Sequence, residues 1–167
     1  FRGSKAYVSQ GGTRVPAFIS YPKQLARGVQ RSELLSVKDI APTLLELAGI
    51  PLPQGRFRGR KVSAISGQSM YSLLHDTYIE TENHSEGRVL GMELFGKRSI
   101  RQGTWNLLEM YSPQGTGEWQ LYNVSTDLAE QNDLASERPD KLKELIELWE
   151  VYAHENKIVI PDWNSGY

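Results

Sequence analysis

The chain has 167 residues, 39% of them hydrophobic and 23% charged, which is typical of one globular domain or of part of a larger protein. It has no run of the roughly 20 apolar residues that a membrane-spanning helix needs and a formal net charge of -1, so we expect neither a membrane protein nor a nucleic-acid binder. Because it contains no cysteine, it can form no disulfide, no thiolate zinc site and no cysteine nucleophile.

The first predicted element is a strand over residues 13–22. Gly11 and Gly12 precede a stretch rich in β-branched and aromatic residues, and Pro22 closes that stretch. A glycine pair marks a turn, and this composition is typical of a strand with little exposure to water. We therefore expect a tight turn that leads into a buried strand.

A helix is predicted next. Its apolar residues repeat at the spacing of one helical face: Val37, Ile40, Ala41, Leu44 and Ala48. Gly49 is placed to end this helix. Asp39 is preferred to Ser36 as its N-cap, because Pro42 then falls in the first turn, where proline is tolerated.

Two less regular segments follow. Residues 51–67 are rich in proline, glycine and arginine, so we expect an extended loop that acts as a linker. Residues 69–75 are expected to form one short helix.

Four short strands are predicted between residues 88 and 124. They are expected at residues 89–95, 98–101, 105–111 and 119–124, separated by Gly96, Gly103 and the loop 112–117. Connections this short favour antiparallel hairpins, because a parallel crossover needs about a dozen residues or more.

The last predicted element is a helix over residues 140–156. Pro139 opens its first turn. One apolar stripe is formed by Leu142, Leu145, Ile146, Trp149 and Tyr152, and charged residues cover the opposite side. One helix laid across a small antiparallel sheet gives the α+β class.

Lys5 is the candidate with chemical character. It lies six residues before Gly11, the first glycine of the turn, which continues through Arg14 into the predicted strand, and a lysine held in this way could place a positive charge against an anion. An exposed lysine without any such role is the alternative. The chain has no nucleophile elbow, no P-loop and no HExxH helix, and its three histidines are scattered, so we expect no metal site.

Three segments carry recognisable motifs, and the first of them, residues 5–16, reads KAYVSQGGTRVP. It resembles the sulfatases of the alkaline phosphatase-like superfamily, in which a lysine before an (E)GGxRVP turn is typical. The family helix D-[IL]-x-P-T-[IL]-L-x-L-A-G is similar to residues 37–49, which read VKDIAPTLLELAG. The family segment ELYDLxxDPxExxNLA resembles residues 119–135, which read WQLYNVSTDLAEQNDLA. Residues 57–60 and 93–103 look most like bacterial arylsulfatases.

The resemblance implies that the chain is the C-terminal portion of a larger enzyme. Residues 1–75 would then be the end of a large α/β catalytic domain, and residues 76–167 a small C-terminal subdomain. Sulfatases hydrolyse sulfate esters with a formylglycine made within a C/S-x-P-x-R motif, beside calcium or another divalent cation. Since that motif is absent here, the nucleophile and the metal are expected in an upstream portion of the same protein, and this chain alone is expected to bind no metal and to be inactive.

By the same resemblance, Lys5 is the one family active-site residue in this chain. It would contact a sulfate oxygen and offset the charge that develops on the leaving oxygen. Gly11 and Gly12 would permit the turn that positions Lys5, and Arg14 would make a structural salt bridge rather than contact the substrate. Gln10 departs from the family, which usually has a glutamate there, and this puts the electrostatics of the turn in question.

The expected partners are the upstream catalytic portion and a sulfate ester substrate, without nucleic acid or membrane. A phosphate or phosphonate monoester hydrolase of the same superfamily is one alternative, since fold does not fix function. A free-standing module that binds anionic carbohydrate is another, and its cations would be Arg56, Arg58, Arg60 and Lys61. The compartment stays open, because sulfatases of this group are cytoplasmic or periplasmic in bacteria and lysosomal or secreted in animals.

Overall fold

The structure, a computed structural model, describes residues 1–75 and 87–162. The chain forms two compact units: unit 1 comprises Phe1–Ala17 together with Ser85–Tyr167, and unit 2 comprises Phe18–His84. Unit 1 is therefore discontinuous in sequence, because the first residues pack with the later sheet. The assignment of residues 1–75 to a large α/β domain stays a prediction.

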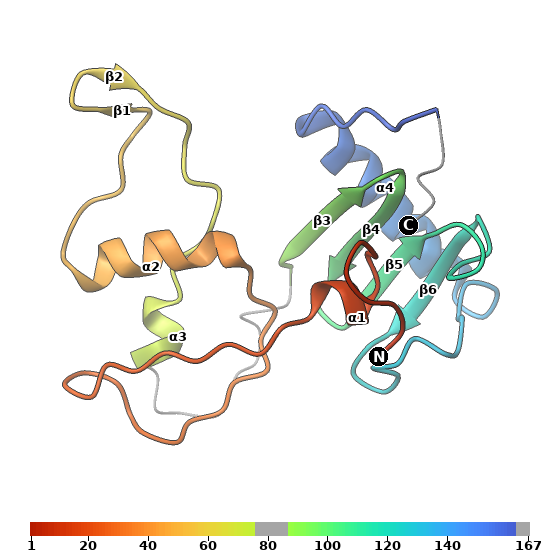
Figure 1. The fold of residues 1–167 in the computed structure, drawn as a ribbon, viewed down its shortest axis with the longest axis horizontal. Coiled ribbons are helices and arrows are strands. Elements are labelled where there is room, and N and C mark those ends of the chain that lie inside the picture. Colours follow the sequence, from red (N-terminus) through yellow and green to blue (C-terminus); the bar gives the residue numbers. More distant parts are fainter. Residues whose placement is uncertain (76–86, 163–167) are drawn as a thin grey trace. The chain divides into compact units, whose positions relative to one another are not determined.

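Unit 1 is built on a four-stranded antiparallel sheet (Figure 1). The strands are β3 (Val89–Leu94), β4 (Lys97–Gln102), β5 (Trp105–Glu109) and β6 (Trp119–Asn123). They pair in chain order, β3-β4-β5-β6. The predicted antiparallel hairpins are confirmed, and every strand ends within two residues of its predicted end.

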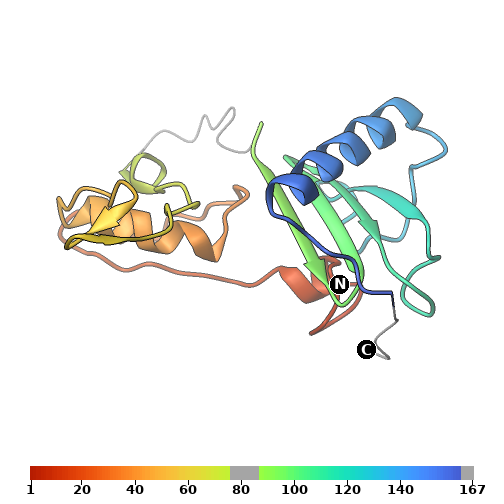
Figure 2. The same cartoon turned by 90° about the horizontal axis from the view of Figure 1, so that it is seen from above.

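One face of this sheet, the helix face, carries the larger core. Ile100, Leu107 and Leu121 lie opposite one another in the register of β4, β5 and β6, and all three are fully buried. They pack against Leu145 and Trp149 of helix α4 (Pro139–Glu155), which crosses the sheet in Figure 2. The predicted helix and its apolar stripe are confirmed, and so is the α+β class.

Gly91 shows how closely α4 approaches the sheet. It lies opposite Ile100 in the register of β3 and β4. A Cβ atom at Gly91 would overlap the ring of Tyr152, which belongs to α4. The absence of a side chain at this position therefore lets the aromatic ring lie directly on the strand.

The opposite face of the sheet, the loop face, is covered by the start of the chain. In Figure 1, helix α1 (Gln10–Thr13) lies in front of the sheet and α4 behind it. Val8 packs there against Leu108, Met110 and Tyr122, and these four side chains are at most 2% exposed. The sheet thus separates two small cores.

The predicted buried strand over residues 13–22 is wrong. Residues 14–20 have no regular secondary structure, and Val15 and Phe18 are 75% and 98% exposed. A strand forms only where a second strand accepts its backbone hydrogen bonds, and no described residue pairs with this segment. Its β-rich composition therefore leads to exposed extended chain here.

Unit 2 is centred on the predicted helix with its capping residues. Ser36 and Asp39 form a capping box around the short helix η1 (Val37–Asp39), and α2 (Ile40–Leu47) continues from it with Asp39 as N-cap. Asp39 thus stands at the predicted N-cap position of α2 but makes no side-chain cap hydrogen bond to it, and the cap hydrogen bonds belong to η1. Gly49 follows α2 with a φ of +67°, as expected for a residue that ends a helix.

Two polar residues of the same segment tie α2 to the chain that follows. The buried Asp39 carboxylate accepts a hydrogen bond from the Gln68 amide at 2.9 Å, and the Thr43 hydroxyl accepts one from the Met70 amide at 2.8 Å. The predicted short helix α3 (Tyr71–His75) begins directly after this contact. Asp39 and Thr43 thus have a structural role in unit 2.

The predicted loop 51–67 contains a small hairpin. Its strands β1 (Arg56–Phe57) and β2 (Arg60–Lys61) are joined by two residues with positive φ, Arg58 at 48° and Gly59 at 80°. Such a pair is typical of a tight hairpin turn. The remainder of the segment has no regular structure, as predicted.

The end of the described chain packs back only in part. Ile158 contacts the helix-face core, whereas Val159 is 84% exposed. No helix among residues 1–75 and 87–162 has the length and apolar character to cross a membrane.

Candidate functional site

Lys5 lies at the tip of a closed loop on the loop face of the sheet. Residues 2–11, here called the lysine loop, are closed by the Gly11 amide, which donates to the Arg2 carbonyl at 2.8 Å. At the tip the Tyr7 amide donates to the Ser4 carbonyl at 3.1 Å, which forms a turn around Lys5. Lys5 is exposed, while Val8, Ser9 and Gln10 behind it are buried.

Gly11 and Gly12 are needed for close backbone approach rather than for an unusual φ. Both lie in α1. A Cβ atom at Gly11 would overlap the carbonyl oxygens of Arg2 and Gly3, and one at Gly12 would overlap the carbonyl oxygen of Tyr7. Since the obstacles are backbone atoms, a side chain at either position would force the loop open. This geometry fits the predicted role of the glycine pair.

Arg2 attaches the beginning of the lysine loop to the sheet. Its guanidinium donates to the Tyr122 hydroxyl at 2.7 Å, to Gln120 Oε1 at 2.9 Å and to the Gln114 carbonyl at 2.9 Å. It also donates to the Glu130 carbonyl at 3.5 Å. Four acceptors around one planar guanidinium fix its orientation as well as its position.

Glu130 attaches the end of the lysine loop. Its side chain is 2% exposed, its Oε2 accepts from the Gln10 amide at 2.8 Å, and its Oε1 accepts from Asn106 Nδ2 at 2.6 Å. Burial raises the pKa of Glu130, and the hydrogen bonds from Gln10 and Asn106 and the charge of Arg2 oppose this rise. The carboxylate thus joins the loop to β5.

Arg14 is exposed beyond this cluster. Burial lowers the pKa of Arg101 on the sheet, the positive charge of Arg14 lowers it further, and the carboxylate of Glu130 opposes both effects. Among residues 1–75 and 87–162, Arg14 makes no ion pair, so its salt bridge stays a prediction.

Lys97 is a second lysine close to the loop. It is 1% exposed, and its ammonium lies 5.3 Å from the ring centroid of Tyr7 and 5.8 Å from that of Phe95. Its nitrogen has no hydrogen-bond partner among the described residues. Burial lowers the pKa of Lys97. Lys97 therefore contacts the lysine loop through the ring of Tyr7.

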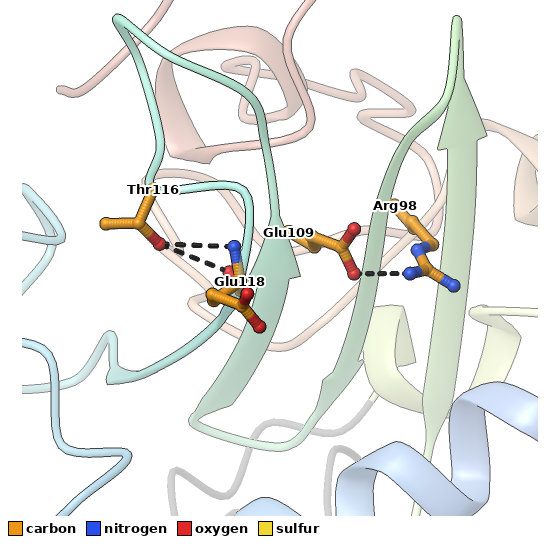
Figure 3. Close-up of polar contacts among 4 residues, drawn as sticks. All are labelled: Arg98, Glu109, Thr116 and Glu118. Atoms are coloured by element: carbon orange, nitrogen blue, oxygen red, sulfur yellow. Dashed lines mark hydrogen bonds and ion pairs between the residues drawn. The ribbon is translucent and has the colours of Figure 1, made fainter.

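A further charged pair lies on the helix face. Arg98 and Glu109 are cross-strand partners in β4 and β5, and their ion pair measures 2.5 Å (Figure 3). Arg98 also lies over the ring of Trp119, 4.9 Å from its centroid. In the neighbouring loop the Thr116 hydroxyl accepts from the Glu118 amide at 3.3 Å. The register of the sheet accounts for the ion pair, which we regard as structural.

The remaining candidates lie apart from the lysine loop in sequence and in unit. Arg56, Arg58, Arg60 and Lys61 are all exposed on the β1–β2 hairpin of unit 2. Within residues 1–75 and 87–162, no group of three or more His, Asp or Glu side chains is arranged to hold a metal ion.

Comparison with known proteins decides the family. Residues 4–153 match the family model described as "N-sulphoglucosamine sulphohydrolase, C-terminal". The chain belongs to the sulfatase family. This chain is the C-terminal region of a sulfatase, as the three sequence motifs predicted.

Relatives agree with this assignment. The chain is 38% identical to an uncharacterized sulfatase of Schizosaccharomyces pombe, over 95% of the chain and 28% of the relative. It is 27% identical to an N-acetylgalactosamine-6-O-sulfatase of Bacteroides thetaiotaomicron, over 90% of the chain and 29% of the relative. The chain thus spans less than a third of the length of either sulfatase.

A solved structure shares the fold. A Bacteroides thetaiotaomicron protein from work on the metabolism of multiple glycosaminoglycans superposes with a TM-score of 0.69 at 24% identity. The match covers 91% of this chain and 32% of that protein. The likeness extends over both units.

Sequence reasoning proposed Lys5 and the glycine pair as site residues, and it did not single out Arg2, Asn106 and Glu130, which hold the lysine loop. No local pattern links these three, because they lie on three separate segments of the chain. The only available signal was the sulfatase-like segment 119–135, in which Glu130 stands at the second glutamate of ELYDLxxDPxExxNLA.

Proposed function

We propose that this chain completes an arylsulfatase-type enzyme that hydrolyses a sulfate ester to an alcohol or phenol and sulfate, with Lys5 as its sulfate-contacting residue. The observation that carries this proposal is the mounting of Lys5. The side chain is exposed at a loop tip, while hydrogen bonds on both sides of it fix the loop to the sheet. An exposed lysine without a function would not require hydrogen bonds that fix its loop on both sides.

Lys5 has one role in the proposed reaction. When the ester bond to sulfur breaks, negative charge grows on the leaving oxygen, and a nearby ammonium stabilises that charge more than it stabilises the intact ester. Because Lys5 makes no ion pair among the described residues, its charge is available to an anion. Lys5 thereby acts as an electrostatic group, and we assign it no proton transfer.

Formylglycine and calcium or another divalent cation are the cofactors that the family implies. The described residues do not fit either: they contain no C/S-x-P-x-R motif and no cluster of carboxylates or histidines that could hold a cation. We therefore assign both to the upstream catalytic portion and derive no step through them from this chain.

The upstream portion is also the proposed partner of the exposed apolar segment after the lysine loop. Val15 and Phe18 would leave water on contact with it, at a gain of about 1.5–3 kcal/mol for each fully buried side chain. The family assignment favours this interpretation over a free-standing carbohydrate-binding module.

The first test replaces Lys5 in the full-length protein. Lys5→Ala should lower kcat for an aryl sulfate such as 4-nitrophenyl sulfate by about 10²-fold or more, because the lost contact acts on charge in the transition state. Lys23→Ala, at an exposed lysine of unit 2, is the matched control and should leave kcat unchanged.

Two outcomes would contradict the proposal. An unchanged kcat/KM in Lys5→Ala would remove Lys5 from the active site. Faster turnover of 4-nitrophenyl phosphate than of the sulfate would favour the phosphate monoester hydrolase instead.

A further inference from the structure

We propose that Glu130 is a positioning residue for Lys5: its buried carboxylate holds the backbone at Gln10 and so fixes the end of the lysine loop. This inference rests on the proposed function, because it assigns Glu130 its role through Lys5.

Two anchors hold the lysine loop to the loop face, one on each side of Lys5. Arg2 is the first anchor, through its contacts with Tyr122, Gln120 and Gln114. The Gln10 amide, which donates to Glu130 at 2.8 Å, is the second. A loop fixed at one end can pivot about that end, whereas a loop fixed at both ends holds its tip in place.

Glu130 supplies the hydrogen bond that joins residues 9–13 to the sheet side of unit 1. The Ser9 hydroxyl donates to the Arg2 carbonyl, within the lysine loop, and the Thr13 hydroxyl donates to the Ser9 carbonyl, so neither reaches the sheet. The side-chain oxygen of Gln10 has no hydrogen-bond partner among the described residues. Loss of the carboxylate would therefore leave the Gln10 amide buried without an acceptor, which is unfavourable for that backbone position.

The backbone at Glu130 has an unusual conformation, which neighbouring residues stabilise. Glu130 has a φ of +55°, a left-handed conformation that a residue with a side chain rarely adopts. Asp127 stabilises the same turn, because its Oδ2 accepts from the amides of Gln131 and Asn132 at 2.8 Å each. A strained residue held by its neighbours is common where geometry serves function.

Asn106 completes the arrangement and permits a conservative test. Its amide occupies the second oxygen of Glu130, at 2.6 Å. A glutamine at position 130 could still accept from the Gln10 amide through its oxygen. Its NH₂ group could donate to Asn106 once the Asn106 amide is turned over. Glu130→Gln should therefore keep the anchor, and Glu130→Ala should remove it.

The first experiment measures backbone hydrogen exchange in the full-length protein. Glu130→Ala should raise the exchange rates of the amides of residues 10–12 by about tenfold or more, while β6 keeps its protection. Glu130→Gln should resemble the parent protein. Glu137→Ala is the matched control, because Glu137 is an exposed glutamate of the same connection without a side-chain hydrogen bond among the described residues.

The second experiment separates positioning from general stability with a double-mutant cycle. On 4-nitrophenyl sulfate, Glu130→Ala alone should lower kcat by about tenfold or more, since small displacements of a catalytic group are costly. In a Lys5→Ala background the same change should cost no further activity. Glu130→Gln should restore most of the rate.

The outcomes are distinguishable. Equal losses in the Lys5 and Lys5→Ala backgrounds, or unchanged exchange at residues 10–12 in Glu130→Ala, would overturn the positioning role. A different result would separate the two proposals. If Glu130→Ala raises exchange at residues 10–12 but Lys5→Ala leaves kcat unchanged, the proposed function is refuted, whereas the role of Glu130 as an anchor of the loop is not.

Discussion

Glu130 and Lys97 are both buried on the loop face, and different contacts offset the cost of burying their charges. Glu130 receives two hydrogen bonds, from Gln10 and Asn106. Lys97 lies only against the rings of Tyr7 and Phe95, and no acceptor for its ammonium is present in the described part of the chain. Cation–π contacts give about 0.5–2 kcal/mol each, whereas the burial of an ion costs several kcal/mol. The charge on Lys97 is therefore destabilising in this chain.

We predict that Lys97→Met stabilises the protein at neutral pH. Methionine fills a similar volume and removes the buried charge. Because burial lowers the pKa of Lys97 in the folded state, the unfolded state binds more protons between that pKa and the usual lysine pKa of 10.5. The penalty on the parent protein is thus largest below the folded pKa and falls as the pH rises.

The measurement is the urea midpoint of unfolding at pH 7 and at pH 10.5, the usual pKa of lysine. The gain of Lys97→Met over the parent should be larger at pH 7. Lys143→Met serves as control, since the Lys143 side chain is 78% exposed. A lower midpoint for Lys97→Met at pH 7 would show that Lys97 pairs with an anion in the full-length protein.

At the scale of elements, α4 stabilises the sheet by packing on its helix face. We predict that Trp149→Ala raises hydrogen exchange throughout β4, β5 and β6 far more than Glu147→Ala does. Trp149 is 1% exposed in the helix-face core, and truncation of a buried tryptophan costs about 3–5 kcal/mol. Glu147 is 68% exposed, and its pair with Lys143 at 4.0 Å contributes little. Equal responses of the two variants would mean that α4 does not pack through this stripe.

The same elements show what the sequence could predict and why. The β3–β6 strands and α4 followed from local information, because alternation, glycine turns and the 3.6-residue stripe all lie within the segments that they define. Residues 13–22 had an equally good strand pattern, but a strand also needs a neighbour, and none of the described residues provides one.

The site divides in the same way. Lys5, Gly11 and Gly12 lie within one short motif and were found together. Glu130 and Gln10 are 120 positions apart, and no periodicity connects them. Only the folded sheet, which brings the turn after β6 onto the loop face, reveals their contact.

At the scale of the whole molecule, we predict that this chain alone does not hydrolyse aryl sulfates. It contains no residue in the context required to become formylglycine, and its described residues form no metal site. The purified chain, assayed on 4-nitrophenyl sulfate with calcium or magnesium added, should show no turnover above buffer. Turnover by the purified chain that disappears in its Lys5→Ala variant would contradict the prediction.

The long separation between Gln10 and Glu130 also has a consequence during synthesis. A ribosome that adds about 5–20 residues per second needs roughly 6–24 s to pass from one to the other. Throughout that interval the nascent chain already carries Lys5 but lacks the carboxylate that holds its loop. A prematurely terminated product would likewise carry the lysine without this anchor, so the order of translation delays the fixing of the lysine loop until Glu130 has been added.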